Sequence, residues 1–372
     1  MPADLRVDGS FFNQEPFMKP DALQSPRILI TRLSAIGDNL LTFPMLVSLK
    51  HHWPQAKVLW VVDCAASQFL QHHPDIDQVM RLPKGFLKRP QLLRQVVRQL
   101  RTFSPTIAID PQGLFKSALL TWLSGARTRI GFDRSQAREA SWWWYSHRVA
   151  VGDGHMIDKQ FQLVKAAGAS LESVDFGWQV PDADRDWAKS TLDQLGLRER
   201  EYLLFNPGSA WPGKNWSPQR FGEVAGKIGK DAGWRTMLLW GNDNELAMAQ
   251  QAVATSDGHA ILAPATTLIQ AAALVSMARL VLSGDTSVLH VATMLGRPSV
   301  SLFGPTLPHR SGPYWRDDIA LQKRYHDGSS RQRRRADASA ILEITRDEVV
   351  EAIEKRLDLP DPMQKEKKWT SG

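Results

Sequence analysis

The chain has 372 residues, of which 43% are hydrophobic and 23% are charged, and its formal net charge is +7. This composition is typical of a globular protein with two ordinary domains and excludes an intrinsically disordered chain. The single cysteine, Cys64, excludes an internal disulfide framework and a multi-cysteine zinc site. We therefore expect a protein of a reducing compartment whose excess basic charge favours anionic ligands, such as phosphorylated substrates, a membrane surface or nucleic acid.

The first 25 residues mix acidic and apolar side chains without a continuous apolar run. We expect a disordered tail there, not a signal peptide, and a second tail over the Lys-rich residues 358–372. No stretch of the sequence reaches the roughly 18 apolar residues of a membrane-spanning helix. We therefore expect a cytoplasmic protein.

Strands alternate with helices along the first half of the chain. The pattern predicts strands at 27–31, 57–63, 78–82, 107–110 and 129–132, and helices ending at Lys50 and spanning 65–71, 90–103, 114–123 and 155–167. Such alternation is typical of a doubly wound parallel sheet with right-handed crossovers. We assign residues 26–180 to this first domain and place its boundary near Pro181.

The turn after the first strand, residues 32–39, contains one glycine, whereas a dinucleotide-binding turn needs three. This argues against a nicotinamide or flavin domain. Asp38 falls at the start of the next helix, where a carboxylate can cap the helix or project into a cleft. Pro44 predicts that this helix begins irregularly.

Three consecutive tryptophans, Trp142 to Trp144, stand near the end of the first domain. On a helix they would span about 200° of the circumference, so they cannot all face one core. At least one should be half exposed and should meet the cleft, the other domain or a lipid headgroup layer. Packing at a domain interface is the interpretation that we favour.

A second run of alternating strands and helices follows, and we assign residues 181–357 to a second doubly wound domain. We predict strands at 202–205, 235–240, 260–262, 280–284 and 300–303. Three predicted helices end near Gly196, Thr255 and Gly296. Three further helices are predicted to start after Ser217, after Thr266 or Thr267, and after Arg346. After Pro305 we expect basic, irregular sequence, with Arg331–Arg335 as a solvated surface loop. The fold class is thus α/β, with two Rossmann-like domains facing each other across a cleft.

The stretch from Leu280 to Pro305 contains the strongest functional pattern. Its strand, Asp-Thr-Ser turn and helix present backbone N–H groups and the positive end of the helix dipole, where a phosphorylated ligand binds. The same residues can be explained without a ligand. In that interpretation Asp285 or Thr286 caps the helix and His290 is a core residue. Lys214 adds an ammonium close to a second helix start, although an exposed loop lysine is the alternative.

Four stretches of this chain resemble the lipopolysaccharide heptosyltransferases. These are the family 9 glycosyltransferases with a GT-B fold, and the resemblance is strongest to the heptosyltransferase I branch. The stretches lie between residues 27 and 306 in the family's order and spacing. They are 32–38 with Pro44, 110–118 with 131–133 and 137–139, 214–216, and 284–305.

The resemblance implies an inverting transfer of heptose from ADP-L-glycero-D-manno-heptose to a lipopolysaccharide core acceptor, with Asp38 as the general base. It assigns donor binding to Lys214, Asp243, Glu245, Asp285, Thr286, Ser287 and His290, with the register of the two acidic residues after Gly241 left open. It implies acceptor binding by Gln112, Lys116 and Arg138. We expect no cofactor. We also expect no metal, because the Asp-x-Asp spacing at 75–77 precedes its strand and that at 182–186 lies in the interdomain connector.

Two positions depart from the family's pattern and leave the nucleotide base and the sugar open. Ser287 replaces a glycine that usually follows Asp-Thr, and Trp211-Pro212-Gly213 replaces polar residues before Lys214. One alternative is a nucleotide-sugar 2-epimerase on the same scaffold. Another is a non-catalytic binder of anionic glycolipid or nucleic acid.

The basic charge and the tryptophans also predict a place for the protein in the cell. We expect weak peripheral contact with the anionic cytoplasmic face of the inner membrane, where a lipid-linked acceptor would be found. We do not expect a nucleic-acid partner, because the basic run 331–335 has no interleaved aromatic residues.

Overall fold

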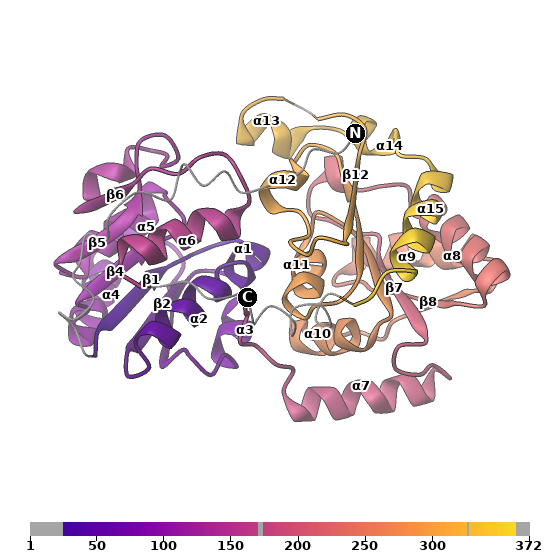
Figure 1. Cartoon of the computed structure of the whole chain (residues 1–372), viewed down its shortest axis with the longest axis horizontal. Coiled ribbons are helices and arrows are strands. Elements are labelled where there is room, and N and C mark those ends of the chain that lie inside the picture. Colours follow the sequence, from indigo (N-terminus) through magenta and orange to yellow (C-terminus); the bar gives the residue numbers. More distant parts are fainter. Residues whose placement is uncertain (1–24, 170–173, 326, 362–372) are drawn as a thin grey trace, which may run out of the picture. The chain divides into compact units, whose positions relative to one another are not determined.

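The computed structural model describes residues 25–169, 174–325 and 327–361 (Figure 1). Except for a few residues at their inner ends, the predicted tails 1–25 and 358–372 lie outside this range. The contacts divide the chain into two compact units, residues 1–177 and 178–372, and each is described separately. The sequence predicts the boundary near Pro181.

The N-terminal unit contains one parallel sheet of six strands in the order β3-β2-β1-β4-β5-β6. The strands are β1 (Arg27–Thr31), β2 (Lys57–Val62), β3 (Gln78–Arg81), β4 (Ile107–Asp110), β5 (Thr128–Phe132) and β6 (His147–Val149). The first five are confirmed at the predicted positions. Strand β6 was not predicted from the sequence, because its three residues include a single buried apolar side chain, Val149.

Helices α1 to α6 connect these strands, and they match the predicted helical ranges with small differences at the ends. They are α1 (Ile36–Leu40), α2 (Phe43–His52), α3 (Ser67–Gln71), α4 (Pro90–Phe103), α5 (Phe115–Leu123) and α6 (Met156–Ala166), with 3-10 turns η3 (Phe86–Lys88) and η4 (Ser141–Trp144). The irregular helix start at Pro44 is confirmed, because two helices replace one there. The exposed tryptophan is also confirmed, since Trp143 is 72% exposed.

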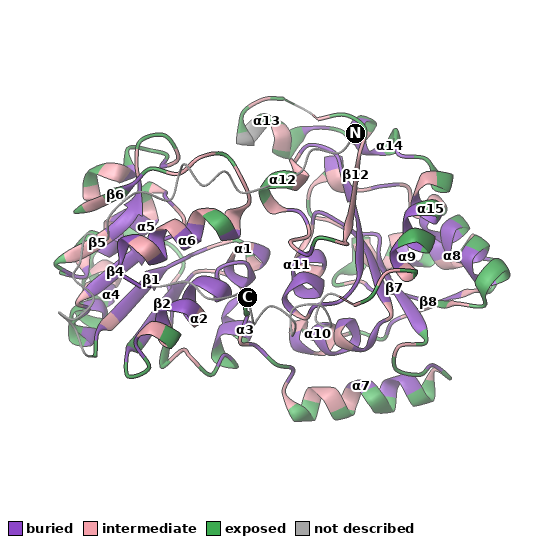
Figure 2. Ribbon diagram, viewed as in Figure 1, coloured by how far each residue is buried: buried purple, intermediate pink, exposed green. Residues whose placement is uncertain are grey.

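One face of the N-terminal sheet packs against α4. Figure 2 shows that the strands of the sheet are mostly buried. Val96, Leu100 and Phe103 lie on one side of this helix and join Leu29 and Val61 in a buried cluster. Their spacing of three and four residues places them on one helical stripe. Burying each such side chain contributes roughly 1.5–3 kcal/mol, which fixes the strands that carry the site loops.

The C-terminal unit also contains one parallel sheet of six strands, in the order β12-β11-β10-β7-β8-β9. The strands are β7 (Tyr202–Asn206), β8 (Arg235–Leu238), β9 (Ala260–Leu262), β10 (Leu280–Gly284), β11 (Ser299–Phe303) and β12 (Ile319–Gln322). The first five are confirmed. The expectation of irregular sequence after Pro305 is wrong, because β12 adds a sixth strand and helices follow it.

Nine helices accompany this sheet within the described part of the chain. They are α7 (Asp182–Gln194), α8 (Pro218–Ala232), α9 (Asp243–Ala254), α10 (Leu268–Met277), α11 (Ser287–Met294), α12 (Pro308–Ser311), α13 (Ser330–Arg335), α14 (Ser339–Leu342) and α15 (Arg346–Leu357), with a 3-10 turn, η5 (Pro212–Lys214). The predicted surface loop at 331–335 is therefore wrong. Ser329 and Gln332 form a capping box that begins α13 there.

In each sheet the strand order reverses at one pair of neighbours. This switch point lies between β1 and β4 in the first sheet and between β7 and β10 in the second. Ligands of open α/β sheets bind beside the carboxyl ends of the strands at such points. The segments that follow these four strands carry Asp38, on α1, Gln112, Lys214, on η5, and Asp285.

Candidate active site

Asp38, in the first turn of α1, is held at the switch point of the N-terminal sheet by Arg32, which lies in the loop between β1 and α1. The Nη2 of Arg32 lies 2.9 Å from Oδ2 of Asp38, and the same oxygen accepts a hydrogen bond from the backbone N–H of Ala35 at 3.1 Å. The side chain of Arg32 is 6% exposed, whereas that of Asp38 is 33% exposed. The carboxylate is therefore fixed in orientation while part of it stays accessible to a ligand.

The loop after β4 supports the loop that carries Asp38. Arg32 donates through Nη1 to the carbonyl of Pro111 at 2.6 Å, and Oε1 of Gln112 accepts from the backbone N–H of Leu33 at 2.7 Å. The sequence motif 32–38 contains Arg32, but the motif alone predicted no role for this residue. The structure therefore brings Gln112 to the Asp38 loop.

The other two predicted acceptor residues lie nearby on the same unit. The Nζ of Lys116, in the first turn of α5, pairs with Oδ2 of Asp63 at 2.5 Å. The backbone N–H of Arg138 donates to the carbonyl of Gly113 at 2.9 Å, and its side chain is exposed. Both residues thus adjoin the loop after β4 that also contains Gln112.

A buried pair, Asp110 and Tyr145, fixes the loop after β4. The carboxylate of Asp110 accepts from Tyr145 Oη at 2.7 Å and from the backbone N–H groups of Gln112 and Gly113 at 2.8 and 3.0 Å. Burial raises the pKa of Asp110 above its usual value, although these hydrogen bonds oppose the shift. Burial and the neighbouring Asp110 also raise the pKa of Tyr145, so its hydroxyl remains a donor.

Gly131 makes this pair possible. A Cβ atom at Gly131 would lie 2.4 Å from two ring carbons of Tyr145, so only glycine leaves room for the ring. Gly131 belongs to the motifs that carry the family resemblance, whereas Tyr145 was not predicted from the sequence. The signal was the placement of Asp110 as the last residue of a buried strand, where its carboxylate requires a partner.

In the C-terminal unit, Lys214, Asp285 and His290 form one cluster at the switch point. The Nζ of Lys214 lies 2.6 Å from Oδ2 of Asp285 and 3.0 Å from its backbone carbonyl oxygen. The Nε2 of His290 lies 3.6 Å from Oδ1 of the same carboxylate. The side chains of Lys214, Asp285 and His290 are 13%, 7% and 7% exposed.

The electrostatics of the cluster favour an ionised Asp285. Burial alone would raise the pKa of Asp285, but the hydrogen bond from His290 and the positive charge of Lys214 outweigh it and hold the pKa below its usual range. The Nδ1 of His290 is buried without a hydrogen-bond partner among the described residues. The interpretation of Lys214 as an exposed loop lysine is therefore wrong. His290 is buried, as a core histidine would be, but its Nδ1 has no hydrogen-bond partner among the described residues, so it is not a fully satisfied core residue.

Helix α11 begins beside this cluster with its first backbone N–H groups uncapped by a side chain. Thr286 is the N-cap residue, but its hydroxyl hydrogen-bonds Ser283 Oγ at 2.8 Å and accepts from Asn206 Nδ2 at 3.2 Å, and makes no capping bond. Side-chain capping by Asp285 or Thr286 is therefore not observed. The free N–H groups of a helix start are suited to an anion, and Ser287 is the first helical residue there.

Of the two acidic residues at the start of α9, Glu245 is the one that reaches the loop after β7. Its Oε2 accepts from the backbone N–H of Gly241 at 2.8 Å, and a Cβ at Gly208 would lie 2.3 Å from its Cγ. Asp243 is exposed in the first turn of α9. The geometry therefore favours Glu245 over Asp243 as the residue at the site's edge.

No group of three or more His, Cys, Asp or Glu side chains in the described ranges is arranged to hold a metal ion. Of the two Asp-x-Asp spacings, the first uses Asp77 to pair with Lys57 at 2.7 Å and to accept from the backbone N–H of Val58. The second forms the first residues of α7. Both spacings thus have structural roles.

Comparison with known proteins identifies the family. The model of glycosyltransferase family 9 (heptosyltransferase) matches residues 93–339. The chain belongs to glycosyltransferase family 9. The resemblance inferred from the four motifs is confirmed, and the chain is a glycosyltransferase.

Similar proteins agree with this assignment. Lipopolysaccharide heptosyltransferase 1 of Pseudomonas aeruginosa is 29% identical over 79% of this chain and 83% of its own length. A family 9 glycosyltransferase structure from Veillonella parvula covers 89% of this chain and 97% of its own, with a TM-score of 0.75 and 25% identity. The E. coli heptosyltransferase WaaC, solved with ADP, covers 90% and 100%, with a TM-score of 0.69 and 24% identity. The α/β fold of two Rossmann-like domains, as in GT-B enzymes, is confirmed.

Proposed function

We propose that this glycosyltransferase moves a heptose from ADP-L-glycero-D-manno-heptose to a lipopolysaccharide core acceptor. The observation that carries the proposal is the Lys214–Asp285–His290 cluster beside the uncapped start of α11. The similarity to a lipopolysaccharide heptosyltransferase 1, and to an E. coli heptosyltransferase solved with ADP, supports the same donor. The cluster is then the site for the donor's diphosphate.

The donor's departing diphosphate gains negative charge as the bond to the sugar breaks. Preorganised donors and cations that face this charge lower the barrier more than they stabilise the ground state. The Nζ of Lys214 and the first N–H groups of α11 offer such stabilisation, and Asp285 holds the lysine in place. Glu245, at the adjoining loop, is the proposed contact to the nucleoside.

Asp38 is the proposed general base. The acceptor hydroxyl attacks the anomeric carbon through an oxocarbenium-like state from the face opposite the diphosphate, which inverts the configuration. One carboxylate must accept the hydroxyl proton, and Asp38 is partly exposed and oriented by Arg32. Because Lys214 and the helix start supply the positive charge, we propose that transfer needs no metal.

Acceptor binding is assigned to Lys116 and Arg138, with Gln112 supporting the Asp38 loop. Arg138 is an exposed residue, and a guanidinium suits an acidic sugar or phosphate on the acceptor. The backbone of Arg138 is hydrogen-bonded to Gly113 in the loop after β4. An acceptor held here would lie on the unit that also carries the proposed base.

An aromatic patch on the same unit supports peripheral contact with an anionic membrane. Trp122 and Trp143 are 48% and 72% exposed, and the ring of Trp144 lies 4.9 Å from that of Trp122 and 6.1 Å from that of Phe115. Between residues 115 and 148 the chain carries six Lys and Arg side chains against two acidic ones. Interfacial aromatic rings beside basic residues are typical of contact with lipid headgroups.

None of the helices in the described parts of the chain combines the length and apolar content that a membrane span requires. We propose reversible association with the cytoplasmic face of the inner membrane, tested by sedimentation with vesicles. Trp143→Ser should weaken binding to phosphatidylglycerol vesicles several-fold, whereas Leu342→Ser, at another exposed apolar position, should not. Equal binding by both variants would contradict this patch as the contact.

Calorimetric titration with ADP, UDP, GDP and dTDP in the presence of EDTA tests the donor. We expect ADP to bind most tightly, and EDTA to leave its affinity unchanged. Tighter binding of a nucleotide with another base would contradict ADP-heptose as the donor, but it would still agree with a glycosyltransferase. Absence of binding to all four nucleotides would contradict the donor site itself.

A further inference from the structure

The ring of Trp211 carries two cations from distant parts of the sequence. The Nζ of Lys214 lies 4.4 Å from the ring centroid, and the Cζ of Arg334, on α13, lies 5.2 Å from it. A cation within about 6 Å of an aromatic face is attracted by the electrons of the ring. Trp211 therefore holds the guanidinium of Arg334 in the neighbourhood of the lysine of the donor site.

The backbone around α13 packs directly on the loop that carries Lys214. A Cβ atom at Gly213 would lie 2.9 Å from the carbonyl oxygens of both Ala336 and Asp337, so only glycine permits this approach. A Cβ at Gly304 would in turn lie 2.7 Å from the carbonyl oxygen of Gly213. The segment after α13 is thus in close contact with η5.

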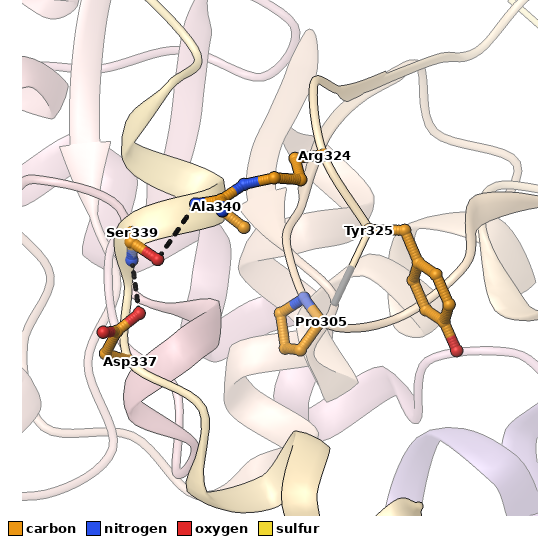
Figure 3. Close-up of a pocket in the computed structure, with 6 residues that line it drawn as sticks. All are labelled: Pro305, Arg324, Tyr325, Asp337, Ser339 and Ala340. Atoms are coloured by element: carbon orange, nitrogen blue, oxygen red, sulfur yellow. Dashed lines mark hydrogen bonds between the residues drawn. The ribbon is translucent and has the colours of Figure 1, made fainter. Parts of the chain in front are cut away.

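Hydrogen bonds keep this segment in place. Asp337 accepts from the backbone N–H of Ser339 at 3.0 Å, and Arg324 donates to Ser339 Oγ at 3.1 Å, beside a small pocket lined by Pro305 and Tyr325 (Figure 3). On α13 itself, Arg333 donates to Tyr325 Oη at 2.7 Å. Arg334 is therefore presented from a supported helix.

The charge balance at the donor site shows why a further cation matters. The positive charge of Lys214 is already matched by the buried carboxylate of Asp285 at 2.6 Å. A nucleoside diphosphate brings at least two negative charges, and its charge at the leaving oxygen increases during transfer. Within the described residues, no carboxylate lies at ion-pair distance from Arg334, which is an exposed residue.

We propose that Arg334 is a second cationic ligand of the donor's diphosphate, held in position by Trp211. The inference rests on the proposed function, because it requires a diphosphate at the Lys214–Asp285 cluster. A guanidinium is always charged and pairs with two phosphate oxygens at once, which suits this role better than an ammonium. The same arrangement explains the unusual Trp211-Pro212-Gly213 loop. The ring of Trp211 orients Arg334, and Gly213 leaves room for the close approach of the segment that follows α13.

Titration of Arg334→Gln with ADP and with adenosine tests the inference. A lost charge-assisted contact to phosphate should weaken ADP binding about tenfold or more and leave adenosine binding within about twofold. Arg335→Gln, the adjacent exposed arginine on the same helix, is the matched control and should bind ADP as the wild type does. Arg334→Lys keeps the charge, so its ADP affinity should fall between those of the wild type and Arg334→Gln.

Trp211 variants separate a role of the ring from a role of the helix. Trp211→Phe should keep most of the ADP affinity, whereas Trp211→Leu should lose as much as Arg334→Gln, with little further loss in the double variant. Equal ADP affinity of Arg334→Gln and Arg335→Gln would overturn the inference and leave the proposed function intact. If the wild type prefers another nucleoside diphosphate, the same loss should appear with that nucleotide; if it binds none, both proposals are contradicted.

Discussion

Lys214 holds Asp285 through two contacts from one atom: its Nζ lies 2.6 Å from Oδ2 and 3.0 Å from the backbone carbonyl oxygen. A buried ion pair is expensive to desolvate and adds little net stability unless its hydrogen bonds are satisfied. Its place at the β7–β10 switch point, next to the start of α11, points to a functional reason for the cost. The pair fixes an ammonium where an anionic ligand is expected.

Lys214→Ala should weaken ADP binding by about tenfold or more, because the variant loses the ammonium that faces the diphosphate. It should also lower the melting temperature, since Asp285 remains buried without its cation. Lys227→Ala is the matched control, because Lys227 pairs with Asp231 on the exposed side of α8. Unchanged ADP affinity in Lys214→Ala, measured by calorimetry, would remove the lysine from the donor site.

Asp38→Asn should reduce turnover by at least about a hundredfold while ADP affinity stays within about twofold. The amide keeps the size of the side chain and its acceptor oxygen for the N–H of Ala35, but it cannot take a proton. Turnover and ADP binding are measured on the same preparation, with Asp75→Asn as a carboxylate control. Near-normal turnover of Asp38→Asn would exclude it as the base.

Asp285→Asn should change how stability depends on pH. In the folded protein the pKa of Asp285 lies below the value of about 4 that an aspartate has in the unfolded chain. The ionised Asp285 therefore stabilises the fold at any pH above the pKa of the unfolded chain. This stabilisation is lost as the pH falls through the lower pKa of the folded protein. The wild type should therefore exceed the variant by on the order of 3 kcal/mol between about pH 5 and 7. Chemical unfolding at several pH values should show the gap narrowing below about pH 4; a constant gap would contradict the ionised pair.

Gly131→Ala should destabilise the N-terminal unit, because the new methyl group would overlap the ring of Tyr145. Overpacking of this kind costs about 1–3 kcal/mol and should displace Tyr145 from Asp110. Tyr145→Phe removes the hydroxyl without changing the packing, so it isolates the hydrogen bond to Asp110. Thermal melting that matches the wild type in Gly131→Ala would show that the ring can move at no cost.

Local signals were enough to predict most of the fold. Apolar runs located ten of the twelve strands, and the capping residue Ser217 with Pro218 marked the start of α8. The two missed strands, β6 and β12, stand at sheet edges, where burial is weaker and the apolar pattern fades. Edge strands depend on neighbours that are distant in sequence, which local patterns do not reveal.

The candidate site shows a similar division. Asp38, Lys214 and Asp285 were proposed from turns and from family resemblance, because each lies in the segment between a strand of a doubly wound sheet and the helix that follows it. Arg32 and Tyr145 were missed, since their importance comes from contacts with residues elsewhere in the chain, and the role proposed for Arg334 rests on such a contact with Trp211. The loop prediction for 331–335 failed for a related reason, because α13 is stabilised by packing on η5 as well as by its own capping box.

The most direct test of the account is a mass-spectrometric assay with ADP-heptose and a lipopolysaccharide core acceptor in the presence of EDTA. We predict that the acceptor gains the mass of one heptose, with inverted configuration at the anomeric carbon, and that ADP is released in equal amount. An isomerised donor without any need for acceptor would indicate an epimerase. That result, or transfer only after a divalent metal is added, would contradict the account.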